Sequence, residues 1–192
     1  MPRPDPGQLA AREDVDLAPV LERHPMDLLV SFSAVTHLAD SPQLRRQVMT
    51  AIDFPSDDMQ LFLVVNQLAL RGAMRPTMLA DAIQTGRSNM TKIAGRLAKE
   101  DLAVRIPDPD DDRGVLLALT PKGREIGRAL VEYDNAQTAR LVDGWSDDDL
   151  ATFQRLLARF TASLGATLPP ATADALGFPR PSDVLAEIAA AK

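Results

Sequence analysis

The chain has 192 residues, a formal net charge of -6 and no cysteine. This length suits one domain with tails, and the absence of cysteine excludes disulfides, thiolate zinc sites and a thiol redox switch. The sequence has no apolar run of about 18 residues and no apolar signal core near its start, so we expect a cytoplasmic protein that does not enter a membrane.

The first quarter of the chain predicts a tail followed by a helical segment. Residues 1–25 are rich in proline and charge and have little hydrophobic periodicity, so a flexible N-terminal tail is expected. Apolar residues then recur at helical spacing over residues 27–39. Ser41-Pro42 kinks or restarts this helix, and its apolar side continues to Ile52. We therefore predict a first flanking helix within residues 26–52.

The next segment predicts a buried helix and a short one. Ser56 is expected to cap a helix in which residues 61–70 are nearly all apolar. A helix that is apolar on most sides is usually buried, so this one should form the centre of the domain. Residues 73–75 are expected to add a short edge strand. Thr77 is expected to cap a short helix whose apolar residues include Leu79.

A second helix is predicted over residues 87–100, after a tight turn at Gln84-Thr85-Gly86 in which Gly86 can cap the new helix. Its apolar stripe consists of Met90, Ile93, Ala94 and Leu97. The opposite side carries cations, hydroxyls and an amide, and Gly95 allows close approach. Such a surface suits a helix in the major groove of DNA, because cations hold phosphates and Arg or Asn reach base edges. An ordinary solvated helix face is the alternative. The candidate DNA contacts are Arg87, Ser88, Asn89, Thr91, Lys92, Arg96 and Lys99.

A β-hairpin is predicted next, from the apolar runs 102–106 and 115–119 separated by the turn-rich insert 107–114. Arg113 at its tip can enter a narrow minor groove, where negative potential is concentrated. The carboxylate of Asp111 is the candidate group that orients it. The two short helices and this wing together predict a winged helix-turn-helix.

The negative net charge is distributed unevenly along the sequence. Residues 71–128 contain 11 lysines and arginines against 8 acidic residues, hence +3, whereas the rest of the chain has 10 against 19, hence -9. Four of the eight acids lie in the insert, at Asp108, Asp110, Asp111 and Asp112. The positive charge is therefore concentrated where DNA is expected.

Residues 61–128 resemble the MarR family of bacterial regulators. The shared features are a Leu-Ala pair, a recognition helix ending in Leu, a D-x-R wing tip and Leu-Thr-x-x-Gly; here they are Leu79-Ala80, Leu97, Asp111 with Arg113, and Leu119-Thr120 with Gly123. Two positions depart from the family pattern, Asp101 in place of a usual glycine and Gly86 in place of a polar cap. The resemblance implies a homodimeric repressor or activator whose affinity for its operator is lowered by a small ligand.

Two more amphipathic helices are predicted after the wing. Thr120-Pro121 opens a long helix to about Val142, and Ser146 with Asp149 opens another. The second is expected to bury Leu150, Phe153, Leu156, Leu157 and Phe160. So much apolar surface favours a homodimer, whose symmetry matches a palindromic operator; packing within one chain is the alternative. Residues 165–192 are expected to be a tail with a short helix from Ser182.

The expected architecture is mainly α with a small β-wing. A MarR-type domain over residues 26–164 would contain a winged helix-turn-helix core, residues 57–120, flanked by dimerisation helices at 26–52 and 121–164. We predict a sequence-specific regulator that binds double-stranded DNA, a dimeric repressor modulated by a small apolar effector. The alternative is a winged-helix module for protein interaction without DNA binding. The ligand-binding residues, the operator and the sign of regulation are not specified by the sequence.

Metal and enzyme functions find little support in the sequence. Asp108, Asp110 and Asp112 imitate the start of a calcium loop, but its sixth position is Arg113 and its twelfth is Leu119. The two histidines, His24 and His37, lack metal-ligand spacing. No phosphate-binding glycine loop or nucleophile motif is present. We therefore expect no metal, no cofactor and no catalysis.

Overall fold

The structure is a computed structural model that describes residues 18, 20, 24 and 27–190. The tail predicted for residues 1–25 falls almost entirely outside the described residues. The chain divides into two units, Met1–Ser41 and Pro42–Lys192. Among the described residues, no helix is long and apolar enough to cross a membrane.

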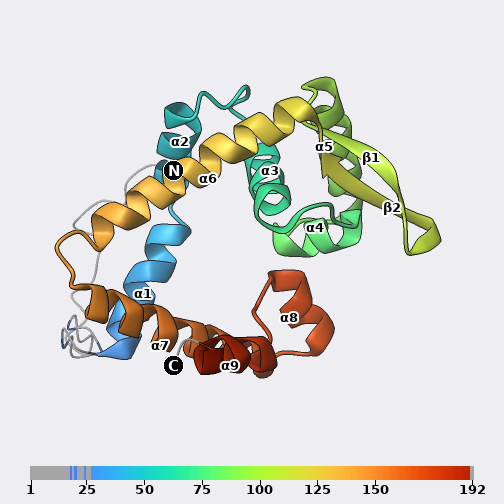
Figure 1. The fold of residues 1–192 in the computed structure, drawn as a ribbon. Helices are drawn as coiled ribbons and strands as arrows, with labels where there is room; N and C mark the ends of the chain where they lie inside the picture. The colour runs from blue at the N-terminus through green and yellow to red at the C-terminus, as the bar shows by residue number, and fades with distance from the viewer. Residues whose placement is uncertain (1–17, 19, 21–23, 25–26, 191–192) are drawn as a thin grey trace, which may run out of the picture. The chain divides into compact units, whose positions relative to one another are not determined.

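The described part of the first unit is dominated by helix α1, Leu28–Ala39 (Figure 1). The Asp27 carboxylate caps it by accepting the backbone N–H of Leu29 at 2.7 Å. No residue of α1 is buried. Its apolar residues Leu28, Val35 and Leu38 are 57–72% exposed.

The second unit contains eight helices and one hairpin among the described residues. In chain order they are α2 Pro42–Ala51, α3 Met59–Arg71, α4 Pro76–Ala82, α5 Arg87–Lys99, β1 Ala103–Asp108, β2 Asp111–Leu119, α6 Pro121–Leu141, α7 Asp147–Ala166, α8 Pro170–Leu176 and α9 Pro181–Ala190. The predicted class, mainly helical with a small β-wing, is confirmed. Figure 1 shows the hairpin beside α5, with its turn projecting from the helices.

Helix α3 forms the centre of this unit, as predicted from its sequence. Val64 and Val65 are fully buried within it, in one hydrophobic cluster with Ile93 of α5 and Leu117 of β2. Each such side chain contributes about 1.5–3 kcal/mol through burial. Leu70, at the end of the apolar run, is exposed. The apolar stripe of α5 is buried in the same cluster, which fixes the opposite side of α5 as its solvent face.

Two predicted helix caps are wrong. The cap of α3 is Asp58, whose carboxylate accepts the N–H of Gln60 at 2.9 Å. The Ser56 hydroxyl instead accepts the N–H of Asp58 at 3.1 Å, so it supports the cap from outside the helix. Helix α4 begins at Pro76, not after Thr77, because the fixed φ of proline suits the first helical position, where no N–H is needed.

The hairpin is longer than predicted. Strands β1 and β2 pair antiparallel from Ala103 opposite Leu119 to Pro107 opposite Val115, and then shift so that Asp108 lies opposite Asp111. Most of the insert 107–114, predicted to be a loop, is therefore strand, and Arg113 lies in the β2 bulge instead of at the turn.

The edge strand predicted for residues 73–75 is reduced to one bridge. Met74 N–H donates to the Leu117 carbonyl at 3.0 Å, and Leu117 N–H donates to the Met74 carbonyl at 2.8 Å. Pro76 follows two residues later and starts α4, so the chain leaves the sheet immediately.

The helices after the wing begin where they were predicted to begin. The Thr120 hydroxyl accepts the N–H of Gly123 at 3.0 Å, and the Ser146 hydroxyl accepts the N–H of Asp149 at 3.1 Å. The burial predicted for α7 is wrong in the single chain, because α9 and Phe178 cover the other side of this helix, where Ala162 and Gly165 are buried. Exposed fractions of 40–49% are found for Phe153, Leu156, Leu157 and Phe160.

The predicted C-terminal helix is present as α9, and the additional helix α8 was not predicted. Arg71, at the end of α3, donates through Nη2 to the backbone carbonyl of Asp174 in α8 at 2.7 Å. Gly177 ends α8 with a left-handed φ of 76°. The C-terminal segment is thus attached to α3 by a hydrogen bond.

Candidate nucleic-acid interface

The turn between α4 and α5 is fixed by local hydrogen bonds. Thr85 N–H donates to the Ala80 carbonyl at 2.8 Å, while Gln84 adopts a left-handed φ of 53°. Gly86 occupies the N-cap of α5 without a side-chain cap. The Asn89 amide donates through Nδ2 to the Thr85 hydroxyl at 2.9 Å. This bond occupies one donor of a predicted DNA contact and ties the start of α5 to the turn.

The outer side of α5 is open to solvent. Asn89 is half-buried and so is Arg96. The other candidate residues on this helix are exposed, namely Arg87, Ser88, Thr91, Lys92 and Lys99. No acidic residue lies within α5, so these cations have no neutralising partner on their own helix.

Arg96 has partners on α3 and its cap. Its Nη1 forms an ion pair with the Asp58 carboxylate, and its Nη2 donates to Gln60 Oε1 at 3.1 Å. These contacts join the middle of α5 to the start of α3, although sequence spacing gave no sign of them. The assignment of Arg96 to DNA stays a prediction.

Arg113 is exposed on β2. Its backbone N–H donates to Asp111 Oδ1 at 3.1 Å. The other carboxylate oxygen of Asp111 lies 3.3 Å from Nη2 of Arg75. Asp111 therefore shapes the backbone at Arg113, while the ion pair that the structure gives this carboxylate is with Arg75.

Arg75 and Asp108 form an ion pair that was not predicted from the sequence. Arg75 donates to Asp108 Oδ2 through Nε at 2.8 Å, and its Nη2 lies 2.7 Å from the same oxygen. Asp108 is buried, and it is the one charged residue that is buried among the described residues. The N–H of Asp110 and then the Arg75 guanidinium hold the pKa of Asp108 below its ordinary value, against the opposing effect of burial, and Asp108 raises the pKa of Arg75. The two residues are 33 positions apart, so no local pattern could have paired them.

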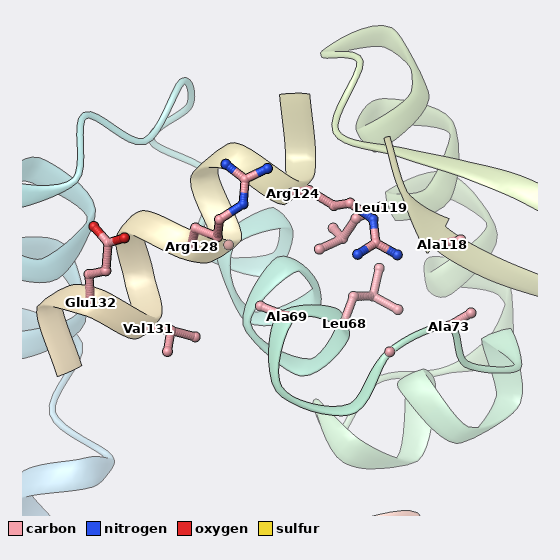
Figure 2. Close-up of a pocket in the computed structure, with 11 residues that line it drawn as sticks. Leu68, Ala69, Ala73, Ala118, Leu119, Arg124, Arg128, Val131 and Glu132 are labelled. Atoms are coloured by element: carbon pink, nitrogen blue, oxygen red, sulfur yellow. The ribbon is translucent and has the colours of Figure 1, made fainter. Parts of the chain in front are cut away.

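A cavity of about 350 Å³ lies between α3, β2 and α6. Leu68, Leu119 and Val131 contribute apolar lining, and Arg124 and Arg128 contribute cations. In Figure 2 the Arg124 side chain extends from α6 toward the β2 side of the cavity. An apolar lining with a few charged groups is typical of small-molecule sites.

Comparison with known proteins agrees with this geometry. Residues 58–115, from the cap of α3 to the middle of β2, match the sequence profile of the MarR family. This segment of the chain is thus similar to the MarR family. The multiple antibiotic resistance protein MarR of Salmonella typhimurium is 27% identical over 99 residues, which cover 51% of this chain and 69% of that protein.

Solved structures of the MarR family share the fold. A MarR-family protein from Bacillus stearothermophilus has a TM-score of 0.57 at 20% identity, covering 71% of this chain and 93% of its own. NadR in complex with 4-hydroxyphenylacetate has a TM-score of 0.50 at 22% identity, covering 74% of this chain and 97% of its own. These likenesses, at 20% and 22% identity, show that the chain shares the fold of these proteins.

The departure of Asp101 from the MarR-family pattern is accommodated by its backbone. Asp101 has a φ of 53°, in the left-handed region that glycine usually occupies and that aspartate tolerates better than most residues. The next N–H, that of Leu102, donates to the Leu97 carbonyl at 2.9 Å and closes the end of α5. Helix α5 therefore ends normally without glycine.

Proposed function

We propose that this chain is a sequence-specific regulator of transcription, a dimeric repressor that inserts α5 into the major groove of double-stranded DNA and places Arg113 in the adjacent minor groove. The observation that carries the proposal is the division of α5 into a buried apolar stripe and an exposed side with cations and no acid. Lys92 and Arg87 would attract phosphates, and Ser88 and Asn89 would approach base edges.

The distribution of charge supports this orientation. Residues 71–128 have an excess of positive charge, whereas the rest of the chain is strongly acidic. DNA would be attracted to residues 71–128, which include α5 and the wing, and repelled by the rest of the chain. The affinity for DNA should therefore fall steeply as the salt concentration rises.

The proposal of a dimer rests on apolar side chains that the single chain leaves in water. On α7, Leu156, Leu157 and Leu164 are each more than 40% exposed, and α1 exposes Leu28 and Val35. Rows of exposed leucines at helical spacing are costly in water and are typical of helix interfaces. A second copy would cover them and would supply the two-fold symmetry of a palindromic operator.

Replacing Lys92 or Arg113 with Ala should weaken binding to a selected operator by about tenfold, since each removes one charged contact to DNA. DNA selected from random or genomic fragments with the wild-type protein would serve as the operator, and gel-shift titration would measure affinity. Arg140→Ala, an exposed cation near the far end of α6, is the matched control and should bind normally. Lys92→Ala should weaken all sequences, whereas Arg113→Ala should weaken mainly sites with a narrow minor groove.

The alternative function, a protein-interaction module, makes the opposite prediction. Wild-type protein would then enrich no DNA sequence, and Lys92→Ala would leave its weak binding to bulk DNA unchanged. Either result would remove the proposed function, provided that circular dichroism shows the variant to be folded.

We further propose that an apolar organic anion lowers DNA affinity by binding the cavity between α3, β2 and α6. The cavity offers an apolar lining and the Arg124 guanidinium, which suit an aromatic or aliphatic carboxylate. The complex of NadR with 4-hydroxyphenylacetate supports this class of ligand. The cavity lies between β2, which belongs to the wing, and α6, which leads toward α7. A ligand bound between these two elements would therefore shift the wing relative to α6.

Calorimetric titration with 4-hydroxyphenylacetate and related aromatic carboxylates should detect binding that Arg124→Gln weakens by about tenfold. The uncharged amides of the same acids should bind wild type weakly, and Arg124→Gln should leave their affinity unchanged. Arg140→Gln, on the same helix but outside the cavity, is the control. Equal binding of acids and amides would exclude Arg124 as the anion-binding group.

A further inference from the structure

We propose that Arg75 and Asp108 form a wing anchor, a pair of positioning residues that holds the hairpin at the angle at which Arg113 meets DNA. The inference deepens the proposed function and rests on it, because it concerns how the wing is presented to the minor groove. Neither residue is proposed to touch a base.

Both carboxylate oxygens of Asp108 accept hydrogen bonds. Its Oδ1 accepts the N–H of Asp110 at 3.0 Å, and its Oδ2 accepts Nε of Arg75 at 2.8 Å. The Asp108 side chain is 6% exposed, compared with 46% for Arg75. A buried carboxylate with both oxygens hydrogen-bonded has little freedom to move, so it fixes the end of β1 and the turn that follows.

The β2 bulge is packed directly against this carboxylate. A Cβ on Gly114 would lie 2.7 Å from Cβ of Asp108 and 3.0 Å from the backbone oxygen of Asp111. Only a residue without a side chain fits there, so Gly114 permits the bulge that contains Arg113 to close over Asp108. The conformation of the backbone at Arg113 and the position of Asp108 are therefore coupled.

One short segment holds the hairpin at two points. The backbone of Met74 pairs with Leu117 near the base of the wing, and the side chain of the next residue, Arg75, reaches Asp108 at the other end. An isolated two-stranded hairpin is only marginally stable in water. The ion pair thus supplies the contact between the turn region of the wing and the start of α4, the first helix of the helix-turn-helix.

The change in DNA affinity caused by Asp108→Asn should have opposite signs for a positioning role and for a purely electrostatic effect. Asp108→Asn removes a negative charge near DNA, so electrostatics alone would strengthen binding. If Asp108 positions the wing, the same substitution should weaken binding, because the amide loses the charge-assisted bond with Arg75. Asp112→Asn removes the same charge from an exposed position of β2 and should bind DNA as well as wild type or better.

The experiment combines Arg75→Ala, Asp108→Asn and Arg113→Ala in a double-mutant cycle on the selected operator. We expect Arg75→Ala and Asp108→Asn each to lower affinity by about tenfold in the wild-type background, and to have little effect when Arg113 is already Ala. Arg75→Lys should recover part of the affinity. If Arg75 instead touched a phosphate, its loss would add fully to that of Arg113→Ala and would reduce the salt dependence of binding.

Hydrogen exchange of the protein without DNA provides a readout that does not depend on the proposed function. Both anchor variants should exchange the amides of residues 104–117 faster than wild type, while the amides of α3 remain protected. Unchanged exchange in the wing, additive losses in the cycle, or stronger binding by Asp108→Asn would each overturn the wing anchor. Faster wing exchange in a protein that selects no DNA would leave the anchor intact and remove the proposed function instead.

Discussion

Gly123→Ala is expected to destabilise the domain by about 3 kcal/mol or more, the largest effect that the fold predicts for a single methyl group. A Cβ at this position would lie 1.9 Å from the backbone oxygen of Leu102 and 2.9 Å from its carbonyl carbon. Neither atom belongs to a movable side chain. The same carbonyl accepts the N–H of Thr120 at 3.1 Å, so relief of the clash would break the junction of β1 with α6.

Urea denaturation followed by circular dichroism measures this effect. Gly95→Ala is the matched control, because Gly95 also lies within a helix but a Cβ there meets nothing within 4 Å. Alanine at this position should stabilise the protein by about 0.5–1 kcal/mol, the usual gain over glycine in a helix interior. A Gly123→Ala variant with wild-type stability would mean that α6 and Leu102 are not in contact.

Leu157→Glu is expected to raise the dissociation constant of the proposed dimer by at least about a hundredfold. Leu157 lies in the middle of the exposed α7 stripe, next to Leu156 and one turn from Phe153. A second copy packed there would bury the new carboxylate without a partner, whereas the single chain would keep it in water. Folding should therefore be unaffected.

Sedimentation velocity at increasing concentrations of protein distinguishes the outcomes. Gln154→Glu adds the same charge to α7 outside the stripe and should remain dimeric. Loss of the dimer should also weaken DNA binding, because the two halves of an operator would no longer be bound together. A wild-type protein that is monomeric at high concentration would contradict the dimer proposal directly.

Hydrophobic periodicity was sufficient to predict most helices of this chain. The stripe from Met90 to Leu97 and the apolar residues of α3 are buried as expected, because helical spacing determines which side of a helix faces the core. Periodicity does not show whether an apolar stripe is buried within its own chain or against another copy. The α7 residues predicted to be buried are exposed in the single chain, since an intramolecular core and an interface use the same apolar residues.

The details of the wing required contacts between distant segments. Proline and four aspartates within residues 107–112 favoured a loop, yet antiparallel pairing with β2 keeps Pro107 in the strand. Arg96, one of the arginines predicted to contact DNA, pairs with Asp58, and Arg75 was not among the predicted site residues. Charge and spacing identify a cation but not the carboxylate that the fold brings to it.

Helix α6 is a single rod of 21 residues that begins at the base of the wing and ends shortly before α7. At about 1.5 Å per residue it is roughly 30 Å long, so a rotation of only about 5° at one end displaces the other by roughly 3 Å. Such a displacement is comparable to the rise of one base pair, about 3.4 Å. In the proposed dimer, the direction of α6 would therefore determine the distance between the two copies of α5. That distance sets the spacing of operator half-sites that the dimer can bind.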